Sequence, residues 1–372
     1  MPARYATLDA WRGVACLMVI GYHSSLVFLA LAPPPAGQVE SAAAWVIGLL
    51  NVGHLGVPIF FVISGYCIAA GAEAVRQRRR SVGSYFLRRF RRIYPPFWIV
   101  VAGSVAFFVI VDVLLWPRLL SDEPWLQPRP WWYSGWQWLG NLTLTETWRH
   151  HVIGGPRGHF PGQAWTLCYE EQFYGVVGVL LLISRRYFFP GVVAVSGGTL
   201  AAVAYHPPWI SGFFFDGSWL TFAAGVLVYW TSTHARTTRS SLLASAALLV
   251  LALMSVWLPI PGGTVAFVFS TALLWLHRWD DEMSKAWWIT PFLYCGQMCY
   301  SLYLVHQLLV KAVTQAAWSW GVHSATATLL VTVPISFAVS IVVGHLCFTW
   351  VERRFLNTSP NRIATPRGSG AP

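Results

Sequence analysis

The first long apolar stretch, residues 8–30, contains two side chains that are costly in lipid and useful in catalysis, Arg12 and His23. On a helix they differ by roughly 1100°, within about 20° of three full turns, and lie roughly 16 Å apart along the axis. An arginine at the centre of a membrane helix costs at least about 2.5 kcal/mol, so it usually faces a polar cavity or a partner. A guanidinium binds phosphates, and a neutral imidazole can accept a hydroxyl proton. The spacing therefore predicts one helix face with an anion-binding group and a base.

Both residues also have a purely structural interpretation. Arg12 can extend to the inner head groups or pair with Asp9, three residues earlier, and His23 can hydrogen-bond a neighbouring helix. Other polar side chains within later apolar stretches favour a shared polar cavity instead. These are His54, Glu170, Glu171 and His306. Glu170 and Glu171 can alternatively stabilise the first turn of their helix, and we assign no role to His54.

The composition identifies lipid as the main solvent of the elements that position these residues. Of 372 residues, 56% are apolar and only 10% are charged, which is too few charges for a water-soluble protein of this size. Apolar stretches long enough to cross roughly 30 Å of hydrocarbon recur along the chain. They predict an all-α fold, a polytopic transmembrane helical bundle of about ten spans: residues 8–30, 45–72, 94–116, 165–184, 187–205, 218–232, 240–258, 262–277, 290–311 and 325–350.

The basic residues predict the orientation of this bundle. With ten spans, both termini lie in the cytoplasm, and 19 of the 25 Lys and Arg residues fall on the cytoplasmic side. The densest cluster lies between the second and third spans and comprises Arg76, Arg78, Arg79, Arg80, Arg88, Arg89, Arg91 and Arg92. We interpret it as a cytoplasmic loop beside the anionic lipids of a bacterial inner membrane. This placement, without any nucleic-acid motif, argues against a nucleic-acid partner.

One integral membrane domain is expected over residues 1–355, followed by a disordered cytoplasmic tail over residues 356–372 that is rich in Pro, Gly and Ser. The longest segment expected outside, residues 117–162, contains Trp131, Trp132, Trp136 and Trp138. It suits an interfacial helix, a lid at the head groups or a surface on which sugars stack. No metal site is expected, because the histidines lie on separate spans without paired ligand spacing.

Five local sequences, in order along the whole chain, resemble motifs of the acyltransferase-three family of integral membrane acyltransferases. The first is Leu8-Asp9-Ala10-Trp11-Arg12-Gly13 followed by His23, and the second runs from Gly53 to Tyr66. The third, residues 86–95, is rich in arginine and ends in proline. The fourth runs from Trp165 to Tyr174, with Thr166 where serine is usual. The last is Tyr300-Ser301-Leu302-Tyr303-Leu304-Val305-His306.

The resemblance implies transfer of an acyl group, most often acetyl from acetyl-CoA, to a sugar hydroxyl of an exopolysaccharide, O-antigen, lipo-oligosaccharide or macrolide-like acceptor. Acetyl-CoA is then a co-substrate, and no permanently bound cofactor is expected. His23 is the expected general base for attack of the hydroxyl on the thioester, and Arg12 is expected to hold CoA phosphates. Glu170 is expected to orient His23, to pair with Arg12 or to bind the acceptor.

Two further groups of residues complete the expected site. Arg88, Arg89, Arg91 and Arg92 can bind the nucleotide part of CoA, or can act only as charges that set the topology. The expected substrate-binding residues are Asp9, Tyr300, Ser301 and His306. Ser301 and His306 can donate a hydrogen bond to the developing oxyanion or to the sugar, or can only bond neighbouring helices. Transfer can be direct or can pass through an acyl-His23 intermediate.

Two other classes of protein also place Arg, His and Glu within a membrane bundle. A proton-coupled transporter or a flippase for a lipid-linked glycan would do so without any need for CoA. The absence of a visible internal repeat argues against the repeat-built transporter folds. A non-catalytic subunit that scaffolds glycan assembly is the second alternative, and it should tolerate the loss of Arg12 or Glu170.

Overall fold

The computed structural model describes residues 5–31, 41–77, 79–120, 128–205 and 208–356, and within these ranges the chain forms helices and no strand. The predicted all-α class is therefore confirmed. Residues 357–372, nearly all of the expected tail, lie outside the described residues. The α-helices are α1 (Leu8–Leu31), α2 (Ala42–Asn51), α3 (Gly56–Arg76), α4 (Val82–Phe108), α5 (Gly135–Leu142), α6 (Glu146–Ile153), α7 (Ala164–Ile183), α8 (Phe188–Tyr205), α9 (Ser218–Thr233), α10 (Thr238–Met254), α11 (Gly263–Leu276), α12 (Asp280–Met283), α13 (Thr290–Gln297), α14 (Cys299–Ser319), α15 (Ala325–Ala327), α16 (Val333–Cys347) and α17 (Arg353–Phe355).

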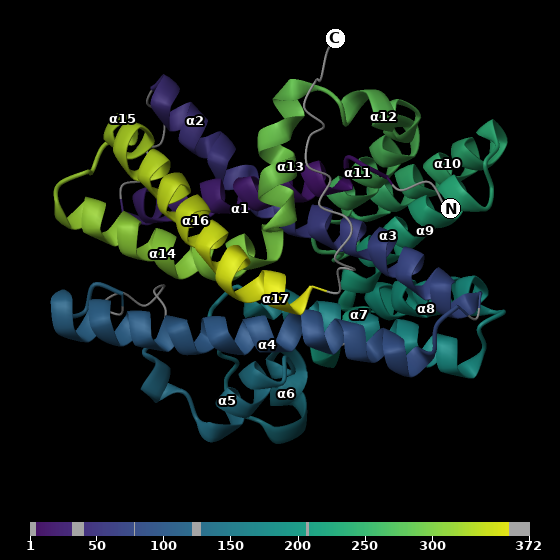
Figure 1. Cartoon of the computed structure of the whole chain (residues 1–372), viewed down its shortest axis with the longest axis horizontal. Coiled ribbons are helices and arrows are strands. Elements are labelled where there is room, and N and C mark those ends of the chain that lie inside the picture. Colours follow the sequence, from purple (N-terminus) through teal and green to yellow (C-terminus); the bar gives the residue numbers. More distant parts are fainter. Residues whose placement is uncertain (1–4, 32–40, 78, 121–127, 206–207, 357–372) are drawn as a thin grey trace, which may run out of the picture.

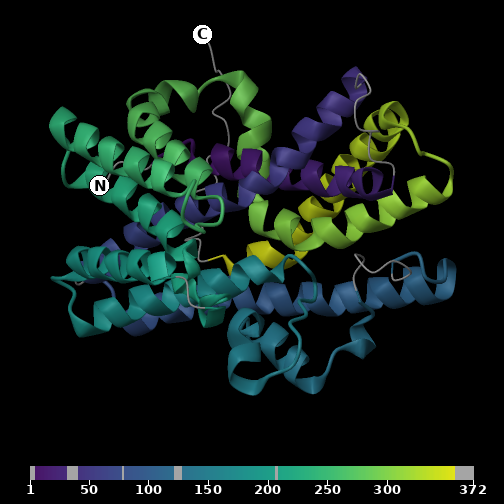
Figure 2. The ribbon, with the colours of Figure 1, turned by 180° about the vertical axis from the view of Figure 1, so that it is seen from behind.

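The long helices run across the molecule and connect two groups of helices at its ends. In Figures 1 and 2, α9, α10, α11 and α12 gather at one end, and α2, α15 and α16 lie toward the other. Helices α1, α3 and α4 extend between the two groups, and α5 and α6 lie on the outer side of α4. The site described below is therefore built mainly where the central helices pass one another.

Six helical segments of the described chain are long and apolar enough to cross a membrane: Leu8–Leu31, Ala42–Arg76, Val82–Leu115, Ala164–Ile183, Phe188–Tyr205 and Ala325–Phe355. The protein is thus an integral, multi-pass membrane protein. The other four expected spans correspond to α9, α10, α11 and the pair α13 and α14, which do not meet the same length and hydropathy criteria. The count of ten spans stays a prediction.

Much of the arginine-rich stretch before the third expected span is helical: Arg76 ends α3, and residues 88–92 lie in α4. Its interpretation as a loop is therefore wrong for these residues. Helix α4 begins at Val82, where the Ser81 hydroxyl accepts a hydrogen bond from the Ser84 N–H at 3.1 Å, and a π-helical segment extends it to Leu115. Arginine is a good helix former, so the helix continues through the charged residues. A helix of 34 residues is roughly 51 Å long, more than the hydrocarbon thickness, so its arginine-bearing end extends beyond the apolar layer.

The ninth expected span, residues 290–311, is two helices. Helices α13 and α14 meet at Met298, which has φ −99° and ψ 15°. They run in clearly different directions in Figure 1. Both helices pack against α1, and α14 also packs against α16. The prediction of one continuous span is wrong because hydropathy measures only how apolar the residues are, and not the direction of the chain.

Small residues let the central helices pack closely. A Cβ atom on Gly296 of α13 would clash with the Asp9 carbonyl, and a Cβ atom on Gly65 of α3 would clash with the Phe222 carbonyl of α9. Glycine at these crossings is typical of helix packing in membranes, where van der Waals contact replaces the hydrophobic effect. The first crossing fixes the part of α1 that carries Asp9 and Arg12.

The tryptophan-rich segment after α4 folds back onto that helix. The Tyr94 hydroxyl donates a hydrogen bond to the Thr143 carbonyl at 3.2 Å, and the Trp98 indole N–H donates one to the Leu142 carbonyl at 2.9 Å. Within the segment, Trp131, Trp132 and Trp136 are exposed, whereas Trp138 is half-buried. The segment contains the helices α5 and α6. Their place at the membrane interface, a role as a lid and the stacking of sugars on the tryptophans stay predictions.

Candidate active site

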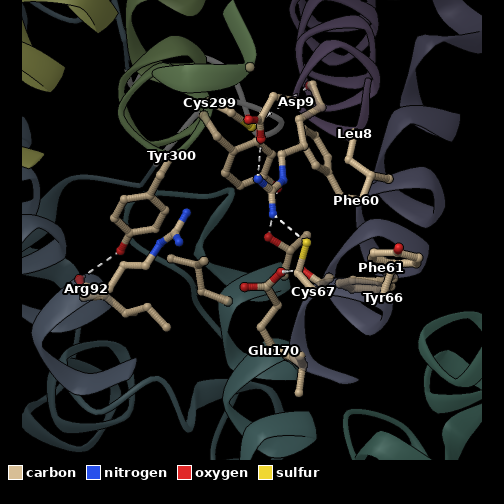
Figure 3. A pocket seen from close by; sticks show the side chains of 18 of the residues that line it. Leu8, Asp9, Phe60, Phe61, Tyr66, Cys67, Arg92, Glu170, Cys299 and Tyr300 are labelled. Carbon is tan, nitrogen blue, oxygen red and sulfur yellow. Dashed lines mark hydrogen bonds and ion pairs between the residues drawn. The ribbon is translucent and has the colours of Figure 1, made fainter. Parts of the chain in front are cut away.

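A cavity of about 470 Å³ lies between α1, α3, α4, α7, α14 and the end of the last long helix. Its polar lining comes from all of these elements, and Figure 3 shows how the side chains converge on it. The volume is in the range of pockets that hold small molecules. The lining residues used below are Asp9, Arg12, Ser64, Cys67, Arg89, Arg92, Glu170, Tyr174, Tyr300, Tyr303 and Glu352.

Arg12 lines this cavity from α1, as the sequence predicted for a polar face. Its guanidinium donates a hydrogen bond to Asp9 Oδ1 at 2.7 Å and another to Cys67 Sγ at 3.0 Å. The i, i+3 ion pair with Asp9 is therefore confirmed. Because a guanidinium has five N–H donors in a planar fork, these two bonds hold its plane while leaving donor capacity for an anionic ligand.

Glu170 reaches the cavity from α7. Its carboxylate accepts hydrogen bonds from the Ser64 hydroxyl and, at 2.9 Å, from the Tyr174 hydroxyl. Because α7 begins at Ala164, Glu170 and Glu171 lie beyond the first turn, and the interpretation that they stabilise that turn is wrong. Among the described residues, no hydrogen bond joins Glu170 to His23 or Arg12, so neither of those two expected contacts forms in this structure.

Two of the four predicted CoA-binding arginines line the cavity. Arg89 and Arg92 belong to its lining, whereas Arg88 and Arg91 do not. Arg89 lies over the Tyr174 ring at 5.0 Å from the ring centroid, within cation–π range. Arg89 and Arg92 are three residues apart and share one face of α4. Helix α4 thus places two cations at the cavity and directs the other two away from it.

The late motif is divided between the cavity and the helix packing around it. Tyr300 lines the cavity, and its hydroxyl donates to the Ile93 carbonyl at 2.8 Å. Ser301 is buried outside the lining, and its N–H and hydroxyl donate to Glu352 Oε2 at 3.0 and 2.7 Å. Ser301 is therefore placed as a structural donor, which is one of the alternatives stated for it.

Glu352 is a cavity residue that the sequence reasoning missed. It ends the π-helical segment η9 (Phe348–Glu352), is 2% exposed and lines the cavity beside the arginines of α1 and α4. The signal in the sequence is a lone carboxylate between an apolar stretch and Arg353. Glu352 follows the last expected span, residues 325–350, at a position where an acidic residue is ordinary.

His23 and His306 form a second site next to the cavity rather than part of its lining. Their ring centroids are 5.2 Å apart, and His306 is fully buried. Tyr303 connects the two sites, because it lines the cavity and its carbonyl lies 2.7 Å from His306 Nδ1. The predicted face of α1 therefore carries Arg12 in the cavity and His23 at the histidine pair. His54 is exposed, bonds the Asn51 carbonyl and does not line the cavity, but its ring contacts Tyr22, which in turn contacts the His23 ring.

Together the fold and the site define a class of protein, a multi-pass membrane protein with a cavity lined by arginines and carboxylates and an adjoining imidazole pair. The sequence profile of the acyltransferase-three family, described as an acyltransferase domain, matches residues 5–349. The chain belongs to this family of membrane acyltransferases. It is an enzyme, which rules out the scaffold and favours group transfer over the transporter or flippase.

Curated relatives agree with this assignment. The chain is 25% identical to BcsY of Komagataeibacter xylinus, provisionally named a membrane-bound transacylase, over 99% of this chain and 87% of that protein. It is 24% identical to the peptidoglycan O-acetyltransferase OatA of Listeria monocytogenes, over 49% of this chain but only 25% of that protein. The O-acetyltransferase OatA of Staphylococcus aureus is 25% identical over 49% of this chain and 26% of its own length. No solved structure matches the chain significantly.

Proposed function

We propose that the protein transfers an acetyl group from acetyl-CoA to a sugar hydroxyl of a glycan or glycosylated acceptor in a bacterial inner membrane. The observation that carries this proposal is the arrangement along α1, with Arg12 in a cavity that Arg89 and Arg92 also line, and His23 in the adjoining histidine pair. A polar donor with phosphates fits the first site, and a hydroxyl that must lose a proton fits the second.

The cavity residues fit the donor. Arg12, Arg89 and Arg92 can bind the phosphates of CoA, with charge-assisted hydrogen bonds that a neutral lining would not supply. The separation of Arg12 and His23, roughly 16 Å along α1, is of the same order as an extended phosphopantetheine arm. A donor anchored by its phosphates in the cavity can therefore present its thioester at the histidine pair.

The histidine pair fits the chemical step. As the acceptor oxygen attacks the thioester carbonyl, the neutral His23 imidazole takes the hydroxyl proton. The C–S bond then breaks, the acyl group remains on the acceptor oxygen, and the CoA thiolate leaves with the proton that His23 releases. The same residues are compatible with an acyl-His23 intermediate, in which the imidazole attacks the thioester first.

The acceptor is proposed from the names of the relatives. Two OatA proteins are O-acetyltransferases, one of them acting on peptidoglycan, and the chain matches about a quarter of each. A sugar hydroxyl of an exopolysaccharide, O-antigen, lipo-oligosaccharide or macrolide-like compound is the corresponding acceptor class here. The exposed tryptophans of the segment packed on α4 offer stacking surfaces for such rings.

The test uses membranes that contain the full-length protein and radiolabelled acetyl-CoA. Wild-type membranes should incorporate label into glycan, and His23→Ala should reduce incorporation to the level of membranes without the protein. His323→Ala is the matched control, because it removes an exposed histidine that contacts Trp318 outside both sites and should leave incorporation unchanged. Undiminished transfer by His23→Ala would refute the assigned base, and no transfer by the wild type would refute the proposed donor.

A further inference from the structure

His306 has a hydrogen-bonding arrangement that fixes which of its nitrogens can accept. Its Nδ1 lies 2.7 Å from the Tyr303 carbonyl, which can only accept, so Nδ1 carries the hydrogen. In a neutral ring, Nε2 is then an acceptor with a lone pair. The ring is 0% exposed, and among the described residues Nε2 has no hydrogen-bond partner. A fully buried acceptor without a hydrogen bond is costly, so we expect Nε2 to gain a hydrogen-bond partner during the reaction.

The neighbour of this acceptor is the proposed base. The centroids of the His23 and His306 rings are 5.2 Å apart, and the ring planes are tilted by 48°. A histidine that acts as a base needs a third group to hold its ring and select its tautomer. Glu170, one candidate for that role, is bonded instead to Ser64 and Tyr174. Such catalytic hydrogen bonds are often long or poorly aligned in structures without substrates and shorten in the reacting complex.

We propose that His306 is the positioning residue of His23, an inference that rests on the proposed acetyl transfer. Nε2 of His306 accepts the N–H of one His23 nitrogen, which leaves the lone pair of the other His23 nitrogen for the acceptor hydroxyl. When that nitrogen takes the proton, the hydrogen bond to His306 also stabilises the imidazolium until the CoA thiolate removes the proton. His306 does not touch the donor cavity, so it should affect turnover and not donor binding.

A merely structural role for His306 would depend on Nδ1, which donates a hydrogen bond to the Tyr303 carbonyl within the same helix. Two substitutions separate the alternatives. His306→Asn places a donor near the Nδ1 position and nothing at Nε2, whereas His306→Gln places an acceptor near Nε2 and abandons the bond to Tyr303. If the local bond matters, the asparagine variant retains activity. If the Nε2 acceptor matters, the glutamine variant retains activity.

The experiment measures kcat and KM for acetyl-CoA with the purified full-length enzyme. We expect His306→Asn to lower kcat by about 100-fold with little change in KM, and His306→Gln to stay within about 10-fold of the wild type. Equal kcat values in the two variants, higher activity in the asparagine variant, or a rise in KM that matches the fall in kcat would each overturn the proposal. If the glutamine variant does not fold, His306→Ala with added imidazole replaces it: rescue of kcat supports the role, and no rescue overturns it. A wild-type enzyme without acetyl transfer contradicts the proposed function instead.

Discussion

At the scale of single residues, the role of each arginine depends on the helix face that carries it. Arg89 and Arg92 line the cavity, while Arg88 and Arg91, which lie in the same two turns of α4, do not. The sequence alone offered all four as one cluster. The fold separates them into a pair that lines the cavity and can contact a ligand there, and a pair that does not line it.

Paired substitutions on α4 test this separation. Arg89→Ala with Arg92→Ala should raise KM for acetyl-CoA by at least about 10-fold, because a hydrogen bond to a charged group contributes about 1.5–3 kcal/mol. The turnover number should change less, since neither residue adjoins the histidine pair. Arg88→Ala with Arg91→Ala removes the same charge from the same helix and should leave KM near the wild-type value. Equal effects of the two pairs would contradict a specific donor contact.

At the scale of elements, composition and spacing predicted the helical membrane bundle and the polar face of α1. They failed where a boundary or a bend depends on three-dimensional contacts. The start of α4 lies twelve residues before the expected span, because the Ser81 cap and the helix-forming arginines extend the helix beyond its apolar part. The bend at Met298 and the inward direction of Glu352 depend on packing between distant segments, which one sequence does not reveal.

The close crossing of α3 and α9 predicts a large effect from one added side chain. Gly65→Val should lower thermal stability in detergent by several degrees, because its Cβ would overlap the Phe222 carbonyl and overpacking typically costs about 1–3 kcal/mol. Gly103→Val is the control, since no heavy atom lies within 4 Å of the position of its Cβ. The midpoint of a thermal unfolding curve measures both, and matching midpoints would contradict the tight crossing.

At the scale of the whole molecule, the two ends of the bundle should face opposite sides of the membrane. The connection between α3 and α4 and the connection between α14 and α15 lie at opposite ends in both views (Figures 1 and 2). The basic cluster spans the first connection and the helix ends beside it, from Arg76 at the end of α3 to Arg92 in α4, which predicts the cytoplasmic side for this end.

Cysteine labelling tests this orientation. In intact cells, a membrane-impermeant maleimide should label His323→Cys, at the α14–α15 end, but not Arg80→Cys, at the α3–α4 end. Both positions are exposed, so accessibility within the protein does not limit the reaction. Permeabilised cells should label both, and the unaltered protein gives the background from its six native cysteines. Labelling of Arg80→Cys in intact cells would contradict a cytoplasmic cluster.

Helix α1 carries both the cavity arginine, Arg12, and the proposed base, His23, so the helix fixes the distance between them. Arg12 and His23 are separated by three turns, roughly 16 Å along the axis. The close contact between Asp9 and Gly296 fixes the position of the helix end that carries Arg12. A thioester whose carrier lacks phosphates has no group that Arg12 can bind. A thioester on a carrier arm shorter than this distance would not reach His23. Under the proposed reaction, the enzyme therefore selects donors by the length of the carrier arm as well as by the acyl group.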